Sequence, residues 1–290
     1  IRLDKNAVDG LAGHILMLEQ VFQQAKNFDV VHFHIDYLHF PLSRRLLAAQ
    51  FTTLHGRLDL SELAALYDEY RDMPVVSISD AQREPLAQAR WLGTVRHGLP
   101  RGLYRYRAEP EGYFAYLGRI CPEKQPDHAI RIAKRCGVKI KLAAKVDQAD
   151  RVYFRDVIEP MLGHPLVDFV GEIDEAQKSG FLGGARALLF PIGWPEPFGL
   201  AMIEALACGT PVIAYRRGSV PEVLQDGVTG FIVDDEDGAV RAAGRLDELS
   251  RARCRAVFEA RFGVERMASD YLALYEMAAS EFRAPAATAR

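Results

Sequence analysis

Two glutamates, Glu196 and Glu204, stand eight positions apart in the segment LLFPIGWPEPFGLAMIEA, which begins at Leu188. The pattern predicts a buried strand that runs into a Gly/Pro-rich turn and then into a helix near Gly199. The spacing places Glu196 before the helix and Glu204 more than one turn inside it, too far apart for a catalytic pair. Each carboxylate could accept hydrogen bonds from vicinal hydroxyls of a ligand. The alternative is that both are solvated surface residues.

Two cations follow another predicted strand, in the segment YLGRICPEK at residues 116–124. Open α/β sheets bind ligands at the carboxyl ends of their strands, where helix starts also favour anions. Arg119 and Lys124 could stabilise a diphosphate there, and Gly118 would allow its backbone a close approach. Loop cations are often merely solvated, but the presence of both segments in one half of the chain favours a ligand site.

The elements around these segments predict a parallel α/β architecture, because short apolar runs alternate with helical patterns. In the C-terminal half, six strands with five intervening helices predict a complete doubly wound sheet. Further helices are expected over about residues 237–277. The six predicted strands are 113–117, 139–143, 167–170, 187–190, 212–215 and 230–233, and the helices between them include 127–136, 153–161, 175–183 and 199–208.

The N-terminal half has about four predicted strands, short by at least one opening βα unit. Residues 98–112 concentrate Gly, Pro and charge, which predicts a linker between domains. We therefore place an N-terminal domain at 1–108, a C-terminal domain at 109–282 and a disordered tail at 283–290. The predicted N-terminal strands are 30–34, 51–54, 75–79 and 94–96, and the predicted helices are 11–25, 42–50, 61–71 and 81–89.

The composition indicates an ordinary globular protein, with 26% charged residues and a formal net charge of −3. This balance gives no reason to expect nucleic acid or an anionic membrane as a partner. No apolar run reaches the roughly 18–20 residues of a membrane span, and no basic-then-apolar leader opens the chain, so we expect a cytoplasmic location. The four cysteines lie far apart without a C-x-x-C pair, which favours buried or inert thiols over disulfides or zinc ligands.

Both chemical segments resemble those of the retaining, family 4 glycosyltransferases of the GT-B fold (glycosyl transferases group 1). The likeness rests on G-R-I-x-P-E-K at 118–124 and on E-P-F-G-L-x-x-x-E-A-x-A-x-G-T-P-V-I-A at 196–214. The run GSVPEVL at 218–224 continues it. The resemblance is close over about 113–275 and looser over 29–100. It implies two Rossmann-like doubly wound domains facing across a cleft, the N-terminal one lacking its first βα unit.

The resemblance also implies roles for named residues. Glu196 would bind hydroxyls of the transferred sugar, Glu204 the nucleotide ribose, and Arg119 with Lys124 the diphosphate. The co-substrate would be a nucleoside diphosphate sugar, UDP- or GDP-linked, with no further cofactor and no metal ion. The donor-binding set is Gly118, Arg119, Lys124, Glu172, Glu196, Phe198, Gly199, Leu200 and Glu204, with Glu172 beside the base and the backbone amides at 198–200 on the sugar.

His55 is the candidate acceptor-side catalytic residue, because it follows a predicted strand in TTLHG, where the family carries a histidine facing donor sugar and acceptor. His32 and His34 alternate on a strand and share one face, but no third ligand at useful spacing supports a metal site. His34 or Asp36 could line the acceptor cleft. His97 and the glycine after it occupy a turn that we interpret as structural.

Two departures from the family pattern keep other interpretations open. No glycine-rich loop precedes Leu11, and the chain starts at Ile1 without an initiator Met. Lys145 stands where the family commonly has glycine, and it could reach a phosphate or be solvated.

The sequence thus predicts a retaining glycosyltransferase with an unidentified acceptor, which could be a saccharide, a lipid-linked molecule or a small molecule. Membrane association and oligomeric state are not indicated. The alternatives are a catalytically diminished nucleotide-sugar-binding homologue, or a GT-B epimerase or phosphorylase.

Overall fold

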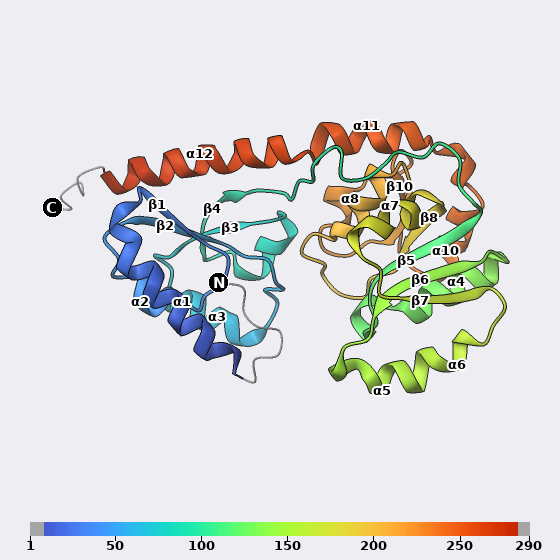
Figure 1. Cartoon of the computed structure of the whole chain (residues 1–290), viewed down its shortest axis with the longest axis horizontal. Coiled ribbons are helices and arrows are strands. Elements are labelled where there is room, and N and C mark those ends of the chain that lie inside the picture. The colour runs from blue at the N-terminus through green and yellow to red at the C-terminus, as the bar shows by residue number, and fades with distance from the viewer. Residues whose placement is uncertain (1–8, 284–290) are drawn as a thin grey trace. The chain divides into compact units, whose positions relative to one another are not determined.

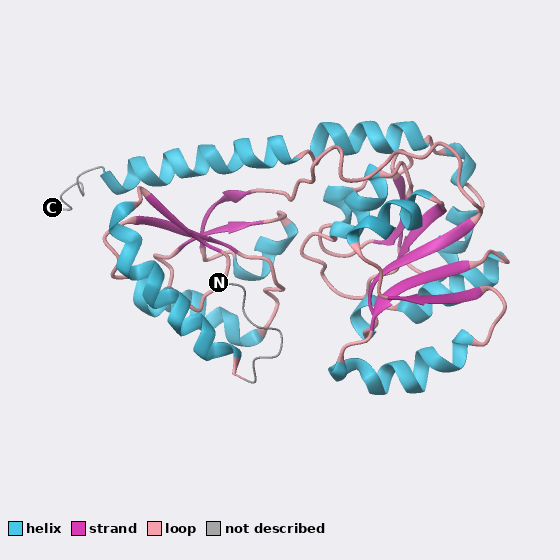
Figure 2. Ribbon diagram, in the orientation of Figure 1, coloured by secondary structure: helices cyan, strands magenta, loops and turns pink. Residues whose placement is uncertain are grey.

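The structure, a computed structural model, describes residues 9–283, which fold as two compact units. Unit 1 comprises the chain up to Ile78, Arg83–Val95 and the segment from Ala268 onward. Unit 2 comprises Ser79–Gln82 and Arg96–Met267. Each unit is built on its own parallel sheet, four-stranded in unit 1 and six-stranded in unit 2 (Figures 1 and 2). The predicted α/β class with two parallel sheets is confirmed.

The sheet of unit 2 has the strand order β10-β9-β8-β5-β6-β7, and every neighbouring pair is parallel. The chain therefore moves outward from β5 in one direction, returns, and moves outward from β8 in the other. This is the doubly wound order that the alternation predicted, and its switch point lies between β5 and β8. The strands are β5 (Tyr113–Arg119), β6 (Ile140–Lys145), β7 (Val167–Gly171), β8 (Ala185–Phe190), β9 (Val212–Tyr215) and β10 (Gly230–Val233).

The helices of unit 2 have clear local causes. Helix α4 has a proline at its first position and ends at Gly137, whose φ of +66° suits a residue without a side chain. Asp174 and Gln177 form a capping box at the start of α7, each accepting a hydrogen bond from the other's backbone N–H. The helices are α4 (Pro126–Cys136), α5 (Arg151–Tyr153), α6 (Glu159–Leu162), α7 (Glu175–Gly183), α8 (Leu200–Ala207), α9 (Val220–Val223), α10 (Glu236–Ala243) and α11 (Arg251–Arg261).

In unit 1 the four strands follow in simple order, β1-β2-β3-β4, all parallel. Phe40 and Tyr67 are fully buried in its main apolar cluster. The other face of the sheet receives the end of α12 (Val264–Arg283), where Tyr275 contacts the ring of Phe51. The remaining elements are α1 (Gly10–Gln24), β1 (Val30–Phe33), α2 (Phe40–Ser43), β2 (Ala49–Thr53), α3 (Ser61–Glu69), β3 (Pro74–Ser77) and β4 (Arg90–Thr94).

The units divide the chain at places other than the predicted boundary at 108. Residues 96–108 belong to unit 2 because they are bonded to it: Leu99 N–H donates to Phe262 O over 2.8 Å, and Arg255 donates to Tyr104 O over 2.9 Å. The end of α12 belongs to unit 1, where the Tyr275 hydroxyl lies 2.9 Å from His32 Nδ1. Arg283, the first residue of the predicted tail, is the last residue of α12, and the rest of that tail lies outside the described residues.

Three elements predicted in the N-terminal half differ in extent from the observed ones. The helix expected at 42–50 ends after one turn at Ser43, whose carbonyl accepts a hydrogen bond from the Gln50 side chain. Pairing with β1 from Ala49 onward overrides the helical propensity of that segment. The helix at 81–89 is a shorter 3₁₀ helix with Pro85 inside it, and the last strand lies at Arg90–Thr94 rather than 94–96.

All four cysteines are free thiols, as predicted, and three of them are buried. Helices long and apolar enough to cross a membrane are absent from residues 9–283.

Candidate functional site

Both chemical segments emerge at the switch point of unit 2. Strands β5 and β8 are direct neighbours, with Ala115 opposite Leu188, so the loops that follow them start from the same edge of the sheet. The backbone joins these loops, since Gly193 N–H donates to Glu123 O over 2.8 Å. In an open α/β sheet this crevice is the expected ligand position.

Lys124 and Glu196 meet in this crevice, with Nζ 2.5 Å from Oε2. Their side chains are only 23% and 10% exposed, so the pair is shielded from water and its attraction is less screened than on an open surface. Lys124 Nζ also lies 5.3 Å from the centroid of the Trp194 ring. The residues predicted to hold the diphosphate and the sugar therefore contact each other here.

The backbone of Glu196 rests against the turn at Gly218 and Ser219. Ser219 N–H donates to Glu196 O over 3.0 Å. Gly218 has a φ of +50°, and a Cβ added to it would lie 2.4 Å from Glu196 O, so no other residue fits without movement. This run was identified as part of the family resemblance without a role in the site, although the glycine before Ser-Val-Pro indicates a tight turn.

The start of α8 is shaped by Gly199 and Phe198. Gly199 has a φ of +78°, and a Cβ there would lie 2.6 Å from the Met202 methyl. Phe198 is 2% exposed, and its ring lies perpendicular to the His97 ring at a centroid distance of 4.9 Å. Leu200 is 44% exposed. The turn is thus fixed by packing, with the first amide groups of α8 at its end.

Glu204 lies inside α8 and is only 7% exposed. Its Oε1 receives Lys178 Nζ at 2.9 Å, and the same ammonium contacts Glu175 Oε2 at 3.1 Å. Lys178 was not predicted as a site residue, because α7 comes to lie beside α8 only in the folded unit.

Arg119 lies apart from the Lys124 pair. Its guanidinium is half-exposed and approaches Asp147 at 3.7 Å and Asp150 at 3.6 Å. Lys145 is exposed and pairs with Asp147 at 2.6 Å. The two predicted diphosphate cations therefore have different partners.

Gly118 and Glu172 remain compatible with a ligand without being required by packing. A Cβ on Gly118 would meet only the Tyr116 side chain, at ordinary contact distances of 3.5 Å to its hydroxyl and 3.8 Å to its ring. Glu172 is exposed and is the first residue after β7, which ends at Gly171 with a φ of +80°.

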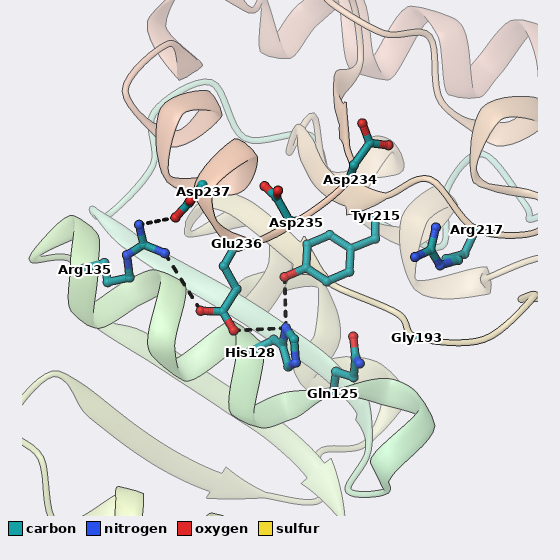
Figure 3. A pocket seen from close by; sticks show the side chains of 10 residues that line it. All are labelled: Gln125, His128, Arg135, Gly193, Tyr215, Arg217, Asp234, Asp235, Glu236 and Asp237. Carbon is teal, nitrogen blue, oxygen red and sulfur yellow. Dashed lines mark hydrogen bonds and ion pairs between the residues drawn. The ribbon is translucent and has the colours of Figure 1, made fainter.

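A pocket of about 450 Å³ adjoins both loops (Figure 3). Gln125 and Gly193 contribute one side of it, next to the Lys124 and Glu196 segments. On another side His128 Nδ1 lies 3.0 Å from the Tyr215 hydroxyl and 3.1 Å from Glu236 Oε1. None of the predicted donor residues lines this pocket. Its lining is Gln125, His128, Arg135, Gly193, Tyr215, Arg217, Asp234, Asp235, Glu236 and Asp237.

In unit 1, His55 follows β2 and lies against His34, with Nε2 2.8 Å from Nδ1. His32 shares a face with His34, as predicted, at a ring-centroid distance of 4.1 Å. Burial, together with the smaller effect of the neighbouring His34 and His55 imidazoles, lowers the pKa of His32 to about 3. Burial also lowers the pKa values of His34 and His55, so the cluster is uncharged at neutral pH. Within residues 9–283, no three His, Cys, Asp or Glu side chains are placed to hold a metal ion.

A D-inositol 3-phosphate glycosyltransferase of Mycolicibacterium smegmatis is 31% identical over 178 residues, which are 59% of this chain and 41% of that protein. The chain thus spans well under half the length of this relative.

Solved structures match at lower identity. Anabaena HepE, determined with UDP and glucose, has a TM-score of 0.78 at 16% identity and covers 94% of this chain and 84% of its own. Sucrose-phosphate synthase from Thermosynechococcus elongatus has a TM-score of 0.77 at 19% identity, with 97% and 83% covered. These likenesses establish the predicted GT-B fold class.

The family model described as Glycosyl transferases group 1 matches residues 106–256, just over half of the chain. That span contains both loops of the switch point. The chain belongs to the group 1 glycosyltransferases.

Proposed function

We propose that this chain transfers a glycosyl group from a nucleoside diphosphate sugar to an acceptor hydroxyl, with retention of anomeric configuration. The observation that carries the proposal is the contact between Lys124 and Glu196 at the switch point of unit 2. A shielded cation beside a shielded carboxylate suits a ligand that presents phosphate and sugar hydroxyls side by side. The family membership of the same segment supports this interpretation.

Lys124 would contact the diphosphate and Glu196 the hydroxyls of the transferred sugar. Arg119, which is half-exposed, would reach the diphosphate from its position near Asp147. Glu204 would accept hydrogen bonds from the ribose. The amides at the start of α8, around Gly199, would add donors for the sugar.

The reaction would proceed by substitution on one face of the sugar. The bond between the anomeric carbon and the phosphate oxygen breaks, the acceptor oxygen bonds to the same face, and the acceptor proton passes to the departing diphosphate. Lys124 and Arg119 would stabilise the charge that develops on that group. A double displacement would require a carboxylate nucleophile at the anomeric carbon. Glu196 would be engaged at the sugar hydroxyls instead, so we propose substitution on one face without a covalent intermediate.

His55 would serve the acceptor side. Its lowered pKa favours a neutral imidazole, which can donate or accept one hydrogen bond to orient the acceptor or the sugar.

The donor base is proposed to be uracil or guanine. The complexes of Anabaena HepE with UDP and with UDP-glucose favour uracil. The acceptor would be a saccharide, a lipid-linked molecule or a small molecule, and catalysis would need no metal ion because side-chain cations stabilise the leaving group.

Thermal-shift screening with UDP-, GDP- and ADP-sugars tests the donor first, since specific binding raises the melting temperature by mass action. The preferred donor is then incubated with candidate acceptors, and NMR of the product reads the anomeric configuration. We expect one nucleotide class to stabilise the protein and a retained configuration in EDTA. An inverted product, or activity that EDTA abolishes and Mg²⁺ or Mn²⁺ restores, contradicts the mechanism.

The same experiment separates the alternatives. A diminished homologue would bind the nucleotide sugar but neither transfer nor hydrolyse it. A phosphorylase would cleave an oligosaccharide with inorganic phosphate and without nucleotide, and an epimerase would convert the donor without an acceptor.

A further inference from the structure

Glu204 is a nearly buried carboxylate inside helix α8. Its side chain is only 9% exposed, on a helix whose last six residues are all buried. A carboxylate in such surroundings needs a partner, because removing an ion from water is costly. The partner is Lys178 of α7, 26 residues earlier in the chain, with Nζ 2.9 Å from Oε1.

Lys178 is itself held in place. It follows the capping box of Asp174 and Gln177, which fixes the first turn of α7. Its ammonium also contacts Glu175 Oε2 at 3.1 Å, and its side chain is 21% exposed. Burial lowers the pKa of Lys178, but the hydrogen bonds and charges of Glu204 and Glu175 outweigh burial and raise it overall. Lys178 is therefore a fixed cation at neutral pH.

Tyr104, in the segment that follows β4, contacts the same group of charged side chains. It is 2% exposed, and its hydroxyl donates a hydrogen bond to Glu175 Oε1. Burial raises the pKa of Tyr104, and the Glu175 and Glu204 carboxylates raise it further, so it remains a protonated donor. The backbone oxygen of Tyr104 is in turn fixed by Arg255 at 2.9 Å. We call Tyr104, Glu175, Lys178 and Glu204 the Lys178 cluster.

We propose that Lys178 is a positioning residue for ribose recognition: it occupies Oε1 of Glu204 and thereby directs Oε2 toward the ribose hydroxyls of the bound nucleotide. This inference rests on the proposed function, in which Glu204 receives the ribose. Without the ammonium, the carboxylate would lose both its charge balance and its fixed orientation. Discrimination for the ribose hydroxyls then depends on Lys178, in addition to the stability that its pairing with the nearly buried carboxylate contributes.

The test is calorimetric titration with the nucleoside diphosphate that binds best among UDP, GDP and ADP, and with its 2′-deoxy and 3′-deoxy forms. In the wild type, we expect removal of the recognised hydroxyl to weaken binding about tenfold or more, the usual effect of losing a hydrogen bond to a charged group. Glu204→Gln should reduce this penalty. Lys178→Met should reduce it to about twofold while also weakening binding of the intact nucleotide.

Two further variants separate orientation from folding. Lys178→Arg restores the charge. It should therefore restore most of the difference in affinity between the intact and the deoxy nucleotide, which a merely structural defect would not predict. Lys139→Met is the matched control in unit 2, because it removes an exposed lysine whose pair with Asp168 is 3.4 Å long. It should keep the wild-type penalty. If Lys178→Met fails to fold, Lys178→Gln replaces it, with the same expected loss of discrimination.

The outcomes distinguish this inference from the function on which it rests. In one outcome, a folded Lys178→Met protein loses as much affinity for the deoxy nucleotide as the wild type does. That result overturns the role of Lys178 and leaves the donor site intact. A wild-type protein that binds none of the three nucleotides overturns the donor site and, with it, this role.

Discussion

Lys124 Nζ lies 2.5 Å from Glu196 Oε2, although 72 residues separate the two along the chain. The contact joins the loop after β5 to the loop after β8, the two strands between which the doubly wound order reverses. A diphosphate and a sugar bound in this crevice would each find one member of the pair. The pair thus keeps both groups in place and shielded before a ligand arrives.

Lys124→Met leaves the Glu196 carboxylate shielded and without its cation. We expect a loss of about 1–3 kcal/mol in the free energy of unfolding, measured in urea, because an unpaired buried charge is costly. Turnover should fall on the order of 10²–10³-fold, as when one charge-stabilising donor is removed. The double variant Lys124→Met/Glu196→Gln should recover stability but not activity. Unchanged donor affinity and turnover in Lys124→Met would remove Lys124 from the site.

Gly218→Ala should disturb the Glu196 loop through a steric clash, because the added Cβ would lie 2.4 Å from Glu196 O. The control is Gly227→Ala, at a φ of +71° with no atom within 4 Å of the added Cβ. Both variants bear the cost of a positive φ, about 1 kcal/mol. Gly218→Ala should lose about a further 1–3 kcal/mol and bind nucleotide more weakly. Equal melting temperatures for the two variants would show that the loop adjusts freely.

His39 should make the stability of unit 1 depend on pH. It is fully buried between Ser43 and Thr52, and burial lowers its pKa to about 3. Below pH 6.5, His39 is protonated in the unfolded chain but stays neutral in the folded chain. The free energy of unfolding therefore falls as the pH drops from about 6.5 toward 3. The loss is up to about 1.4 kcal/mol per pH unit for this histidine.

His39→Gln should be less stable at pH 7.5 but should show a shallower loss between pH 6 and pH 5. The measurement is urea unfolding followed by fluorescence of Trp91, which lies in unit 1, in a Trp194→Phe background. His164→Gln in unit 2 is the control for losing one imidazole. Parallel pH profiles for His39→Gln and its parent would show that another group carries the dependence.

His55→Asn tests the acceptor side. The predicted nucleotide contacts all come from unit 2, whereas His55 belongs to unit 1. We therefore expect the transfer rate to fall on the order of 10²–10³-fold, within the range for a positioned proton-transfer or hydrogen-bonding group. The Kd for the nucleoside diphosphate should stay within about twofold. A variant with wild-type transfer, or one that loses nucleotide affinity in the same proportion, would contradict the assignment of His55.

Much of the local structure of this protein could be predicted from its sequence. Helix α7 was predicted with its observed bounds, because the capping residues before it and the apolar spacing within it act over one or two turns. Strands β9 and β10 were likewise predicted with their observed bounds, since buried parallel strands are short, continuous apolar runs. Candidate site residues could also be predicted, because Gly118, Arg119 and Lys124 lie at or just after the end of β5, and Glu196 and Glu204 follow β8.

Tertiary structure decided which of these residues meet. The order β8-β5-β6 joins Lys124 to Glu196 and leaves Arg119 with Asp147, a division that no periodicity encodes because it depends on pairing between distant strands. The same dependence explains why Lys178, Gly218 and the early end of α2 escaped prediction. Each is fixed by a neighbour that the chain brings in from elsewhere, and the energy of that contact exists only once the sheet has formed.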